Sequence, residues 1–366
     1  MSFRILHLNT ERGWRGGERQ TLWLARELER RGHVNILAAR PKEPLARAAA
    51  EAGLRVFPLA PWSEWDFRNA ARLRVFLRQE RLDLVHAHTG HAVGLGALAR
   101  RGTAARLVAT RRVDFPLKNN FLSRWKYRSV DALAAISDAV RQMLVRGGVL
   151  PSKITVIPSG VDTGAYPDAR DRDRLRSERG FSPRDRLVVH AGALVPHKDQ
   201  ATLLRAFAGL RARGAADRLL VLGDGPRREE LVRLSETLGL GGAVAFLGHR
   251  GDVLEYTAMA DLFVFSSVDE GLGTALLDAL AMGVPTAATA AGGIPDLYGG
   301  PGAPELSAPG DADALAANMA AVLENPEEAR RRSERGRERA RAFTVSAMAD
   351  AYETLYRKLL EAPCPA

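Results

Sequence analysis

The sequence has a single cysteine, Cys364, close to its end. One thiol cannot form a disulfide within the chain, which favours a reducing compartment over a disulfide-stabilised secreted protein. Long apolar runs are also missing: no stretch approaches the roughly 18 residues of a membrane span, and the start "MSFRILHLNTERGW" is too short and polar for a secretory signal. We therefore expect a cytoplasmic protein.

Lysine is scarce as well, because only six of the 53 Lys and Arg residues are lysines. The charge is uneven: residues 1–165 hold 28 basic against 14 acidic residues, and the remainder holds 25 against 29. This asymmetry is compatible with an acidic acceptor or with a peripheral contact to an anionic membrane, on its inner face. A general bias toward arginine is the alternative explanation. The charge comes without an aromatic-interleaved or finger motif, so we expect no nucleic acid as a partner.

Short β-like runs alternate with helical patterns along the 366 residues, which is typical of parallel sheets with helical crossovers. Both halves of the chain begin with a strand, a glycine-bearing loop and a helix. The sequence therefore predicts an α/β fold with two doubly wound domains facing a central cleft. The runs are RILHLN, VNILAA, LRVFPL, LDLVHAH, RLVATR, ALAAIS and ITVIPS in the first half, and RLVVHAGAL, DRLLVLGDG, AVAFLG and DLFVFSS in the second.

A polar stretch rich in Gly and Pro, residues 158–185, interrupts this alternation and is typical of a linker. We expect a first domain at residues 1–165 and a second at 166–343. An amphipathic helix in residues 344–366 has no strand after it, so it should pack back toward the first domain. The charged segment before it is expected to be a solvated helix face.

The stretch "SSVDEGLGTALLDALAMGVP" (266–285) places a glycine-rich turn between an apolar strand and a helix. Thr274 is expected to cap the helix, and Gly271 and Gly273 leave its first amides open to an anion. Glu270 precedes the turn, and Asp278 lies one turn inside the helix. Carboxylates accept hydrogen bonds from paired hydroxyls, so a sugar–diphosphate–ribose ligand fits. Alternatively, both acids only favour the helix N-terminus, by about 0.3–1 kcal/mol each.

Three further strand-end loops carry comparable residues. "AGALVPHKD" (191–199) supplies Lys198, "VLGDGP" (221–226) ends another strand, and "AAGGIPDLY" (290–298) offers a second glycine pair. The carboxyl ends of parallel strands meet at one edge of a sheet, where such sheets bind ligands. The four loops therefore favour one nucleotide-sugar site.

These motifs resemble glycosyltransferase family 4, whose members are retaining enzymes with the GT-B fold, and the resemblance covers nearly the whole chain. The family's Glu-x7-Glu motif matches Glu270 to Asp278, and its "GxL…K" segment matches Gly192 to Lys198. The motif LGDGP matches directly, and "PSGVD" (158–162) resembles the usual PNGVD at the domain junction. The segment "RGGERQTLWLARELERRGH" (15–33) matches the family's first loop and helix.

The resemblance implies an N-terminal acceptor-side domain and a C-terminal nucleotide-sugar-binding domain, both Rossmann-like. It implies transfer of a hexose-like sugar from a UDP-, GDP- or ADP-sugar, without cofactor or metal. The basic first half of the chain favours a glycan or lipid-linked acceptor. Glu270 would hold donor-sugar hydroxyls, Asp278 the ribose, and the LGHRG loop the base. The catalytic residues implied are Glu270, Lys198 and Arg112. The donor-binding residues implied are Gly16, Gly17, Gly192, Lys198, Gly223, His249, Arg250, Glu270, Leu272, Gly273, Thr274 and Asp278.

Two positions depart from the family pattern. The second acid is Asp278 rather than Glu, which is one methylene shorter. Ala193 stands where the family has a phosphate-binding arginine, and loss of one charge-assisted hydrogen bond costs about 1.5–3 kcal/mol. Arg111 or Arg112, in "ATRRVDFP", is the candidate replacement, at a place where many relatives have a histidine.

Histidines gather in "HAHTGHA" (86–92), after a predicted strand. His86 and His88 would share a face of the strand, whereas His91 lies beyond it. Metal ligation, hydrogen bonding to the acceptor and a structural role all remain open for this cluster. We take His86, His88 and Asp114 as candidate acceptor contacts and predict no metal.

Two other functional classes fit the same motifs. A sugar-nucleotide epimerase of GT-B architecture would use paired acids and histidine without an acceptor. A non-catalytic nucleotide-sugar binding protein would tolerate the loss at Ala193. A metal-independent retaining glycosyltransferase is the function that the sequence favours.

Overall fold

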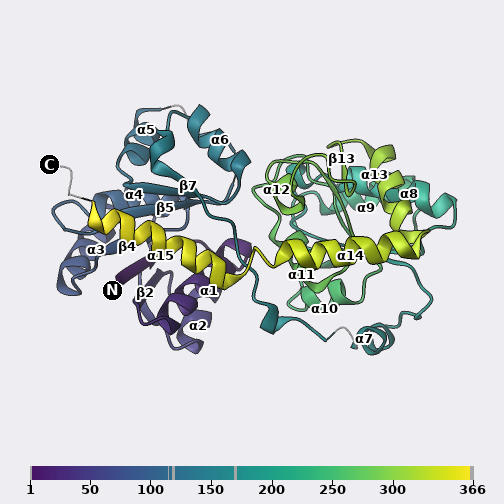
Figure 1. The fold of residues 1–366 in the computed structure, drawn as a ribbon, viewed down its shortest axis with the longest axis horizontal. Helices are drawn as coiled ribbons and strands as arrows, with labels where there is room; N and C mark the ends of the chain where they lie inside the picture. Colours follow the sequence, from purple (N-terminus) through teal and green to yellow (C-terminus); the bar gives the residue numbers. More distant parts are fainter. Residues whose placement is uncertain (1, 114, 118–119, 169–170, 363–366) are drawn as a thin grey trace. The chain divides into compact units, whose positions relative to one another are not determined.

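The computed structural model describes residues 2–113, 115–117, 120–168 and 171–362. Asp114 and Cys364 lie outside these ranges, so the predictions for them are not addressed. The chain forms two compact units (Figure 1): unit 1 is residues 1–160 with 345–366, and unit 2 is residues 161–344. Each unit has one parallel sheet with helical crossovers, which confirms the α/β prediction of two doubly wound domains.

Unit 1 has a seven-stranded sheet in the order β3-β2-β1-β4-β5-β6-β7. All seven predicted strands are present. The strands are β1 (Arg4–Leu8), β2 (Val34–Ala39), β3 (Arg55–Pro58), β4 (Leu84–Ala87), β5 (Arg106–Arg111), β6 (Ala132–Ala135) and β7 (Ile154–Val156). The helices are α1 (Gly16–Arg30), α2 (Pro44–Glu51), α3 (Phe67–Gln79), α4 (Gly90–Ala99), α5 (Phe121–Arg128), α6 (Asp138–Arg146), the short η1 (Pro151–Lys153) and α15 (Val345–Glu361).

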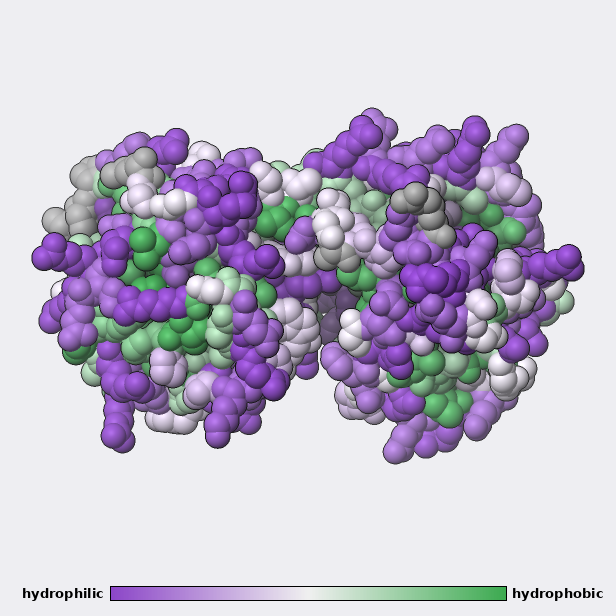
Figure 2. Space-filling model, turned by 90° about the horizontal axis from the view of Figure 1, so that it is seen from below, coloured by the Kyte–Doolittle hydropathy of each residue, from purple (hydrophilic) through white to green (hydrophobic). Residues whose placement is uncertain are grey.

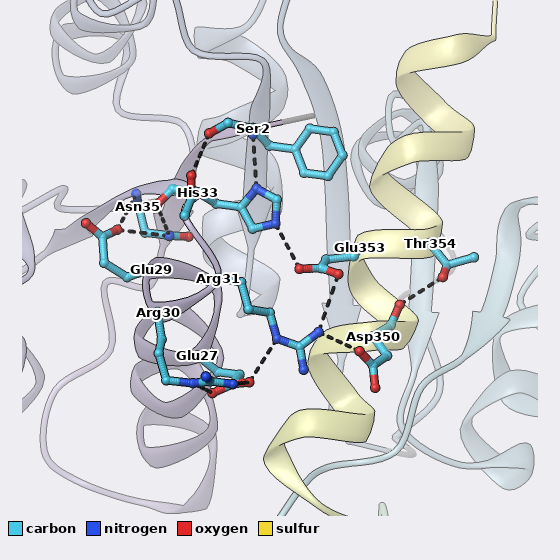
Figure 3. A network of polar contacts seen from close by, with 12 residues as sticks. Ser2, Glu27, Glu29, Arg30, Arg31, His33, Asn35, Asp350, Glu353 and Thr354 are labelled. Carbon is cyan, nitrogen blue, oxygen red and sulfur yellow. Dashed lines mark hydrogen bonds and ion pairs between the residues drawn. The ribbon is translucent and has the colours of Figure 1, made fainter.

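One face of this sheet is covered by α1 and by the last helix, α15. The two helices share a core with β1, β4, β5 and β6, and they lie side by side. The last turn of α1 is held to α15 by ion pairs of Arg31 with Asp350 and Glu353 (Figure 3). Helix α4 packs closely on the other face of the sheet. Its Gly96 allows this approach, because a Cβ there would lie 3.1 Å from a Leu107 methyl group.

Unit 2 has a six-stranded parallel sheet in the order β10-β9-β8-β11-β12-β13. The last two strands were not among the predicted runs. The strands are β8 (Leu187–Ala191), β9 (Arg218–Leu222), β10 (Val244–Gly248), β11 (Leu262–Phe265), β12 (Thr286–Thr289) and β13 (Leu306–Ser307). The helices are η2 (Thr163–Ala165), α7 (Arg172–Glu178), η4 (Pro196–Lys198), α8 (Gln200–Ala212), α9 (Arg228–Thr237), α10 (Val253–Ala258), α11 (Thr274–Met282), α12 (Ile294–Tyr298), α13 (Ala312–Leu323) and α14 (Pro326–Ala340).

The core of unit 2 packs α8, α9 and α13 against β8, β9, β11 and β12. The segment read as a linker is partly built into this unit. Within it, Arg176 of α7 is only 1% exposed, and its guanidinium donates to the carbonyl of Met259 and to Asp261. Burial of such a charge requires these acceptors, so α7 is anchored to the amino end of β11.

The charged helix α14 is more than a solvated face. Its residues Glu328 and Arg332 are buried and paired at 2.7 Å, and Arg332 also donates to the carbonyl of Thr286. A Cβ at Gly336 would lie 3.0 Å from a methyl group of Leu280, so α14 packs tightly on α11. The prediction of a solvated helix was therefore wrong for one face of α14.

Among the described residues, no helix combines the length and the apolar character needed to cross a bilayer. On the face drawn in Figure 2, hydrophobic residues form small patches among hydrophilic ones in both units.

Candidate functional site

Unit 2 gathers its glycine-bearing loops at the carboxyl ends of its strands. The loops after β8, β9, β11 and β12 all lie at that edge, and the strand order reverses between β8 and β11. Sheets of this kind bind ligands at such a reversal. The loop after β12 joins the one after β11, because the Gly293 amide donates to the carbonyl of Glu270 at 2.8 Å.

The start of α11 presents backbone amides without a side-chain cap. Gly273 is the N-cap, with φ at +87°, and no side chain among the described residues caps the helix. Thr274 is the first helical residue, so the prediction that Thr274 caps α11 was wrong. A left-handed φ suits glycine and leaves no Cβ in front of the amides. The helix start can therefore hold an anion.

Lys198 and Glu270 form an ion pair beside this helix start. Their side chains are only 14% and 15% exposed, and the ammonium also lies 4.5 Å from the centre of the Phe265 ring. The two residues come from loops after β8 and β11, as the sequence predicted. A half-buried pair of this kind supplies a cation for a phosphate and a carboxylate for hydroxyls once a ligand separates them.

Asp278 is buried one turn into α11 and accepts a hydrogen bond from the hydroxyl of Tyr166 at 3.0 Å. Tyr166 follows η2 at the beginning of unit 2, and no motif in the sequence predicted this contact. The hydroxyl occupies one carboxylate oxygen of Asp278. The second carboxylate predicted for the ribose is therefore oriented by an aromatic hydroxyl.

Gly223 and Gly225 are required by close backbone packing. A Cβ at Gly223 would lie 2.0 Å from the carbonyl oxygen of Gly192, and a Cβ at Gly225 would lie 2.4 Å from that of Leu194. The amide of Gly223 also donates to the carbonyl of Gly248. These contacts hold together the loops after β8, β9 and β10.

The residues proposed for the base lie on the last of these loops. His249 and Arg250 are exposed, and Arg250 pairs with Asp252 at 2.7 Å. Arg228 approaches the same loop, because its Nη2 donates to the carbonyl of Phe246. Its Nη1 is buried without a partner among the described residues. Arg228 is a polar group at this loop that sequence reasoning missed.

A buried histidine braces the loop that carries Lys198. The Nδ1 of His190 lies 3.0 Å from the carbonyl of Val264, and its Nε2 lies 3.3 Å from the amide nitrogen of Gln200. Gln200 also donates to the carbonyl of Ala193 at 2.9 Å. Burial lowers the pKa of His190 to about 4. The chain thus fixes the backbone at Ala193, where the family's arginine is missing.

In unit 1, Gly16 and Gly17 open helix α1, as the family motif implies. A Cβ at Gly17 would lie 3.6 Å from Cδ of Arg112, so the arginine stem crosses the helix start. The Nη1 of Arg112 donates to Ser159 at 3.2 Å. Its Nε and Nη2 are buried and have no partner among the described residues.

His86 and His88 lie in a buried cluster rather than on an open surface. His86 is fully buried, with one ring nitrogen 2.6 Å from Thr110 Oγ1 and the other 2.6 Å from the Tyr356 hydroxyl. Both nitrogens are thus engaged within unit 1, so we do not carry His86 into an acceptor site. His88 is 3% exposed, and its Nε2 lies 3.0 Å from Nδ1 of His7.

The same cluster is the one group of possible metal ligands found among the described residues. His7, His86 and His88 have ring nitrogens within 4.8 Å of one another. The exposed His91 in α4 is not part of it. Every nitrogen except Nδ1 of His88 already makes a hydrogen bond. The arrangement suits a hydrogen-bonded chain better than a metal, which needs a lone pair from each ligand.

Comparisons with known proteins agree with these observations. The model of "Glycosyltransferase Family 4" matches residues 14–165, and that of "Glycosyl transferases group 1" matches residues 171–339. A Bacillus subtilis protein named as the glycosyltransferase EpsD is 31% identical over 79% of this chain and 82% of its own. The chain belongs to glycosyltransferase family 4. Family membership does not favour the epimerase or the non-catalytic binding protein.

Two further relatives extend the comparison. N-acetyl-alpha-D-glucosaminyl L-malate synthase of Bacillus anthracis is 28% identical over 85% of this chain and 84% of its own. The crystal structure of Anabaena HepE in complex with UDP covers 97% of this chain and all of its own, with a TM-score of 0.84 and 21% identity. This likeness confirms the GT-B fold. The family-4 protein described here is a glycosyltransferase.

Proposed function

We propose that this family-4 enzyme transfers a hexose-like sugar from a nucleoside diphosphate sugar to a hydroxyl of an acceptor, with retention and without a metal ion. The observation that carries the proposal is the Lys198–Glu270 pair beside the uncapped start of α11. A cation and free amides suit a diphosphate, and a carboxylate suits sugar hydroxyls. The UDP in the HepE structure and the sugar in the name of the B. anthracis relative are consistent with such a donor.

The chemistry assigned to each group follows from its charge. As the bond between the sugar and the diphosphate breaks, negative charge grows on the leaving phosphate. The amides of Leu272, Gly273 and Thr274 and the ammonium of Lys198 stabilise that charge. Glu270 releases Lys198 and turns to the sugar hydroxyls. Arg112 is the third proposed catalytic residue.

Asp278 is the proposed ribose contact, with the Tyr166 hydroxyl fixing one of its oxygens. Gly192 and Gly223 let the diphosphate approach the backbone, and the loop at His249 and Arg250 takes the base. No carboxylate is assigned to the reacting carbon, so attack on the face of the leaving group is the favoured route to retention.

The acceptor is proposed to bind in unit 1, and neither buried histidine, His86 nor His88, is assigned to it. A glycan or lipid-linked acceptor fits the basic character of residues 1–165, and a contact with anionic membrane rests on that charge alone. The B. anthracis relative is named for L-malate, a small hydroxylated anion. Both acceptor types belong in the assays.

A thermal-shift panel of UDP-, GDP- and ADP-sugars tests the donor. One donor should raise the Tm, because a ligand that binds only the folded state stabilises it by about 2.7 kcal/mol at 100 times its Kd. Sugar release is then measured with and without a glycan, a lipid-linked sugar or L-malate. Release that requires an acceptor supports transfer. Conversion of the donor without an acceptor, or no stabilisation by any donor, contradicts the proposal.

A further inference from the structure

A chain of buried polar side chains crosses one face of the unit 1 sheet. In the parallel register Ile5 pairs with Asn35, and His7 pairs with His86, so these side chains share a face. This is the face that α1 and α15 cover. The chain leads from Asn35, near the amino end of β2, to His88, just beyond the carboxyl end of β4. It therefore connects the amino end of the sheet to its carboxyl end, where sheets of this kind bind ligands.

The first link fixes which way the Asn35 amide points. Its Nδ2 donates to Oε2 of Glu29 at 3.0 Å and to the carbonyl of His33 at 3.1 Å (Figure 3). Both partners can only accept, so the amide cannot be flipped. Its Oδ1 therefore faces Nε2 of His7, at 3.0 Å. Because this oxygen only accepts, His7 must carry its proton on Nε2.

The tautomer of His7 determines that of His88. Burial lowers the pKa of His7 to about 4, so the ring is neutral near pH 7 and its Nδ1 has no proton. That nitrogen can only accept, and its partner at 3.0 Å is Nε2 of His88. His88 must therefore carry its proton on Nε2. Burial, with the neighbouring His86, His7 and Arg112, lowers the pKa of His88 well below its usual value, which leaves Nδ1 as a bare acceptor.

Arg112 is the donor that lies near this acceptor. Arg112 follows β5, the strand beside β4, and its charge is one of the causes that lower the pKa of His88. Its Nε and Nη2 hydrogens lack partners, as does His88 Nδ1, among the described residues. An unpaired buried donor and an unpaired buried acceptor are each unfavourable, and a hydrogen bond between them satisfies both. The other groups near the guanidinium are Glu18 and the Tyr352 hydroxyl.

We propose that Glu29, Asn35 and His7 are positioning residues that hold His88 in its Nε2–H form, so that His88 Nδ1 accepts one N–H of Arg112 and orients its guanidinium. This inference rests on the proposed role of Arg112 in the reaction. This relay, which runs from Glu29 through Asn35 and His7 to His88, adds no charge next to Arg112. It sets the direction of a guanidinium that has one other hydrogen bond, to Ser159.

The protonation of the histidines is tested directly by NMR of the full-length protein with 15N-labelled histidine, assigned with single His→Gln variants. At pH 7, His7 and His88 should both show a proton on Nε2 and a bare Nδ1. A proton on Nδ1 of His88, or a doubly protonated ring, would overturn the inference. This result does not depend on any activity, so it is separate from the proposed function.

A double-mutant cycle tests the coupling to Arg112. Asn35→Leu should lower kcat about tenfold with little change in donor KM, which is within the usual coupling of contacting residues. In the Arg112→Gln background the same change should cost less than twofold. Independent, multiplicative effects would contradict the relay. If Arg112→Gln alone leaves kcat unchanged, the proposed function of Arg112 fails instead.

Asp131→Asn is the matched control for general damage to the sheet. Asp131 precedes β6 at the amino end of the sheet, away from His88 and Arg112. It accepts hydrogen bonds from Arg100 and from the amide of Leu107, both at 2.7 Å. Its loss should weaken unit 1 without touching the relay. Any effect of Asp131→Asn on kcat should therefore be the same with Arg112 and with Gln at that position. A reduced effect in the Arg112→Gln background would show that the cycle reports stability, which would remove support for the relay.

Discussion

The two units place a buried histidine at the same position of a central strand and use it differently. His7 is the fourth residue of β1, and His190 is the fourth residue of β8. Burial lowers the pKa of both to about 4, so both are neutral near pH 7. His7 donates from Nε2 to a side chain, Asn35, whereas His190 donates from Nδ1 to a main-chain carbonyl, that of Val264. The neutral histidine therefore carries its proton on Nε2 in unit 1 and on Nδ1 in unit 2.

The difference shows how each unit supports its strand-end loops. In unit 1, the bare Nδ1 of His7 accepts a hydrogen bond from Nε2 of His88, and this bond determines which nitrogen of His88 is protonated. In unit 2 the bare Nε2 of His190 faces the amide of Gln200, which holds the carbonyl of Ala193. Unit 1 thus orients a side chain, and unit 2 orients the backbone of the loop that ends in Lys198. Three substitutions and a change of pH test these two arrangements.

Glu270→Gln should have the largest effect, because the unit 2 site loses its only proposed carboxylate for the donor sugar. We expect kcat/KM for transfer to fall about 100-fold or more, which is typical of the loss of one oriented group in an active site. Steady-state transfer assays measure it. Asp269→Asn, at the adjacent half-buried position, is the control and should stay close to the parent enzyme. Equal activity of Glu270→Gln and the parent would remove Glu270 from the site.

Lys198→Gln should lower kcat/KM about 10- to 100-fold, since a hydrogen bond to a charged group contributes about 1.5–3 kcal/mol. Calorimetry should show that the variant binds nucleoside diphosphates more weakly than the parent enzyme does. The loss of affinity should be smaller for the nucleoside alone. Lys358→Gln, on the exposed side of α15, removes a charge far along the sequence from the site and should bind like the parent. Equal losses for the diphosphate and the nucleoside would argue against a phosphate contact.

Acid should unfold unit 1 before unit 2. A histidine whose folded pKa is lowered binds a proton more readily when unfolded, so stability falls as the pH drops from 6.5 toward 4, by about 1.4 kcal/mol per pH unit for each such group. Unit 1 buries His7, His86 and His88 with lowered pKa values, whereas unit 2 fully buries His190.

The five tryptophans all lie between residues 14 and 125, so their fluorescence reports on unit 1 alone. Circular dichroism reports on both units. On titration from pH 7 to pH 4, the fluorescence transition should come at the higher pH. Coincident transitions, or an earlier loss of circular dichroism, would contradict the assignment of more buried neutral histidines to unit 1.

Gln200→Ala should have the smallest effect, because Gln200 acts on the loop backbone rather than on the ligand. We expect about a fivefold loss of kcat/KM, near 1 kcal/mol, which is the usual contribution of a single hydrogen bond. Thr202→Ala in the same turn of α8 is the control, since its hydroxyl contacts only the capping Asp199 among the described residues. A larger loss for Thr202→Ala would show that the cap of α8, and not the His190–Gln200 chain, supports the loop.

The fold was predictable from the sequence to the extent that its strands are apolar. All seven runs of unit 1 became strands. In unit 2, β12 was implied only by the strand-end loop that follows it and β13 was missed, because "TAAT" and a two-residue strand carry little β-forming signal. The charged helix α14 was misread, since ion pairs such as that between Arg332 and Glu328 are satisfied only in the fold.

The positions of the candidate residues were predictable where a motif is contiguous. Glu270 and Lys198 were found from their loops, and the structure pairs them. The Tyr166 contact with Asp278 was not, because it joins residues 112 positions apart. His7 gave no signal either, as its place opposite His86 depends on the strand register. Sequence patterns reveal loops at strand ends, whereas contacts across strands need the three-dimensional structure.

The central claim is that the strand-end loops of unit 2 hold a diphosphate between Lys198 and the start of α11. A crystal structure with the nucleoside diphosphate of the stabilising donor tests it most directly. We expect phosphate oxygens within hydrogen-bond distance of the amides at residues 272–274 and of Lys198, with the ion pair to Glu270 opened. A bound nucleotide that leaves this ion pair intact and these amides without a phosphate would contradict it.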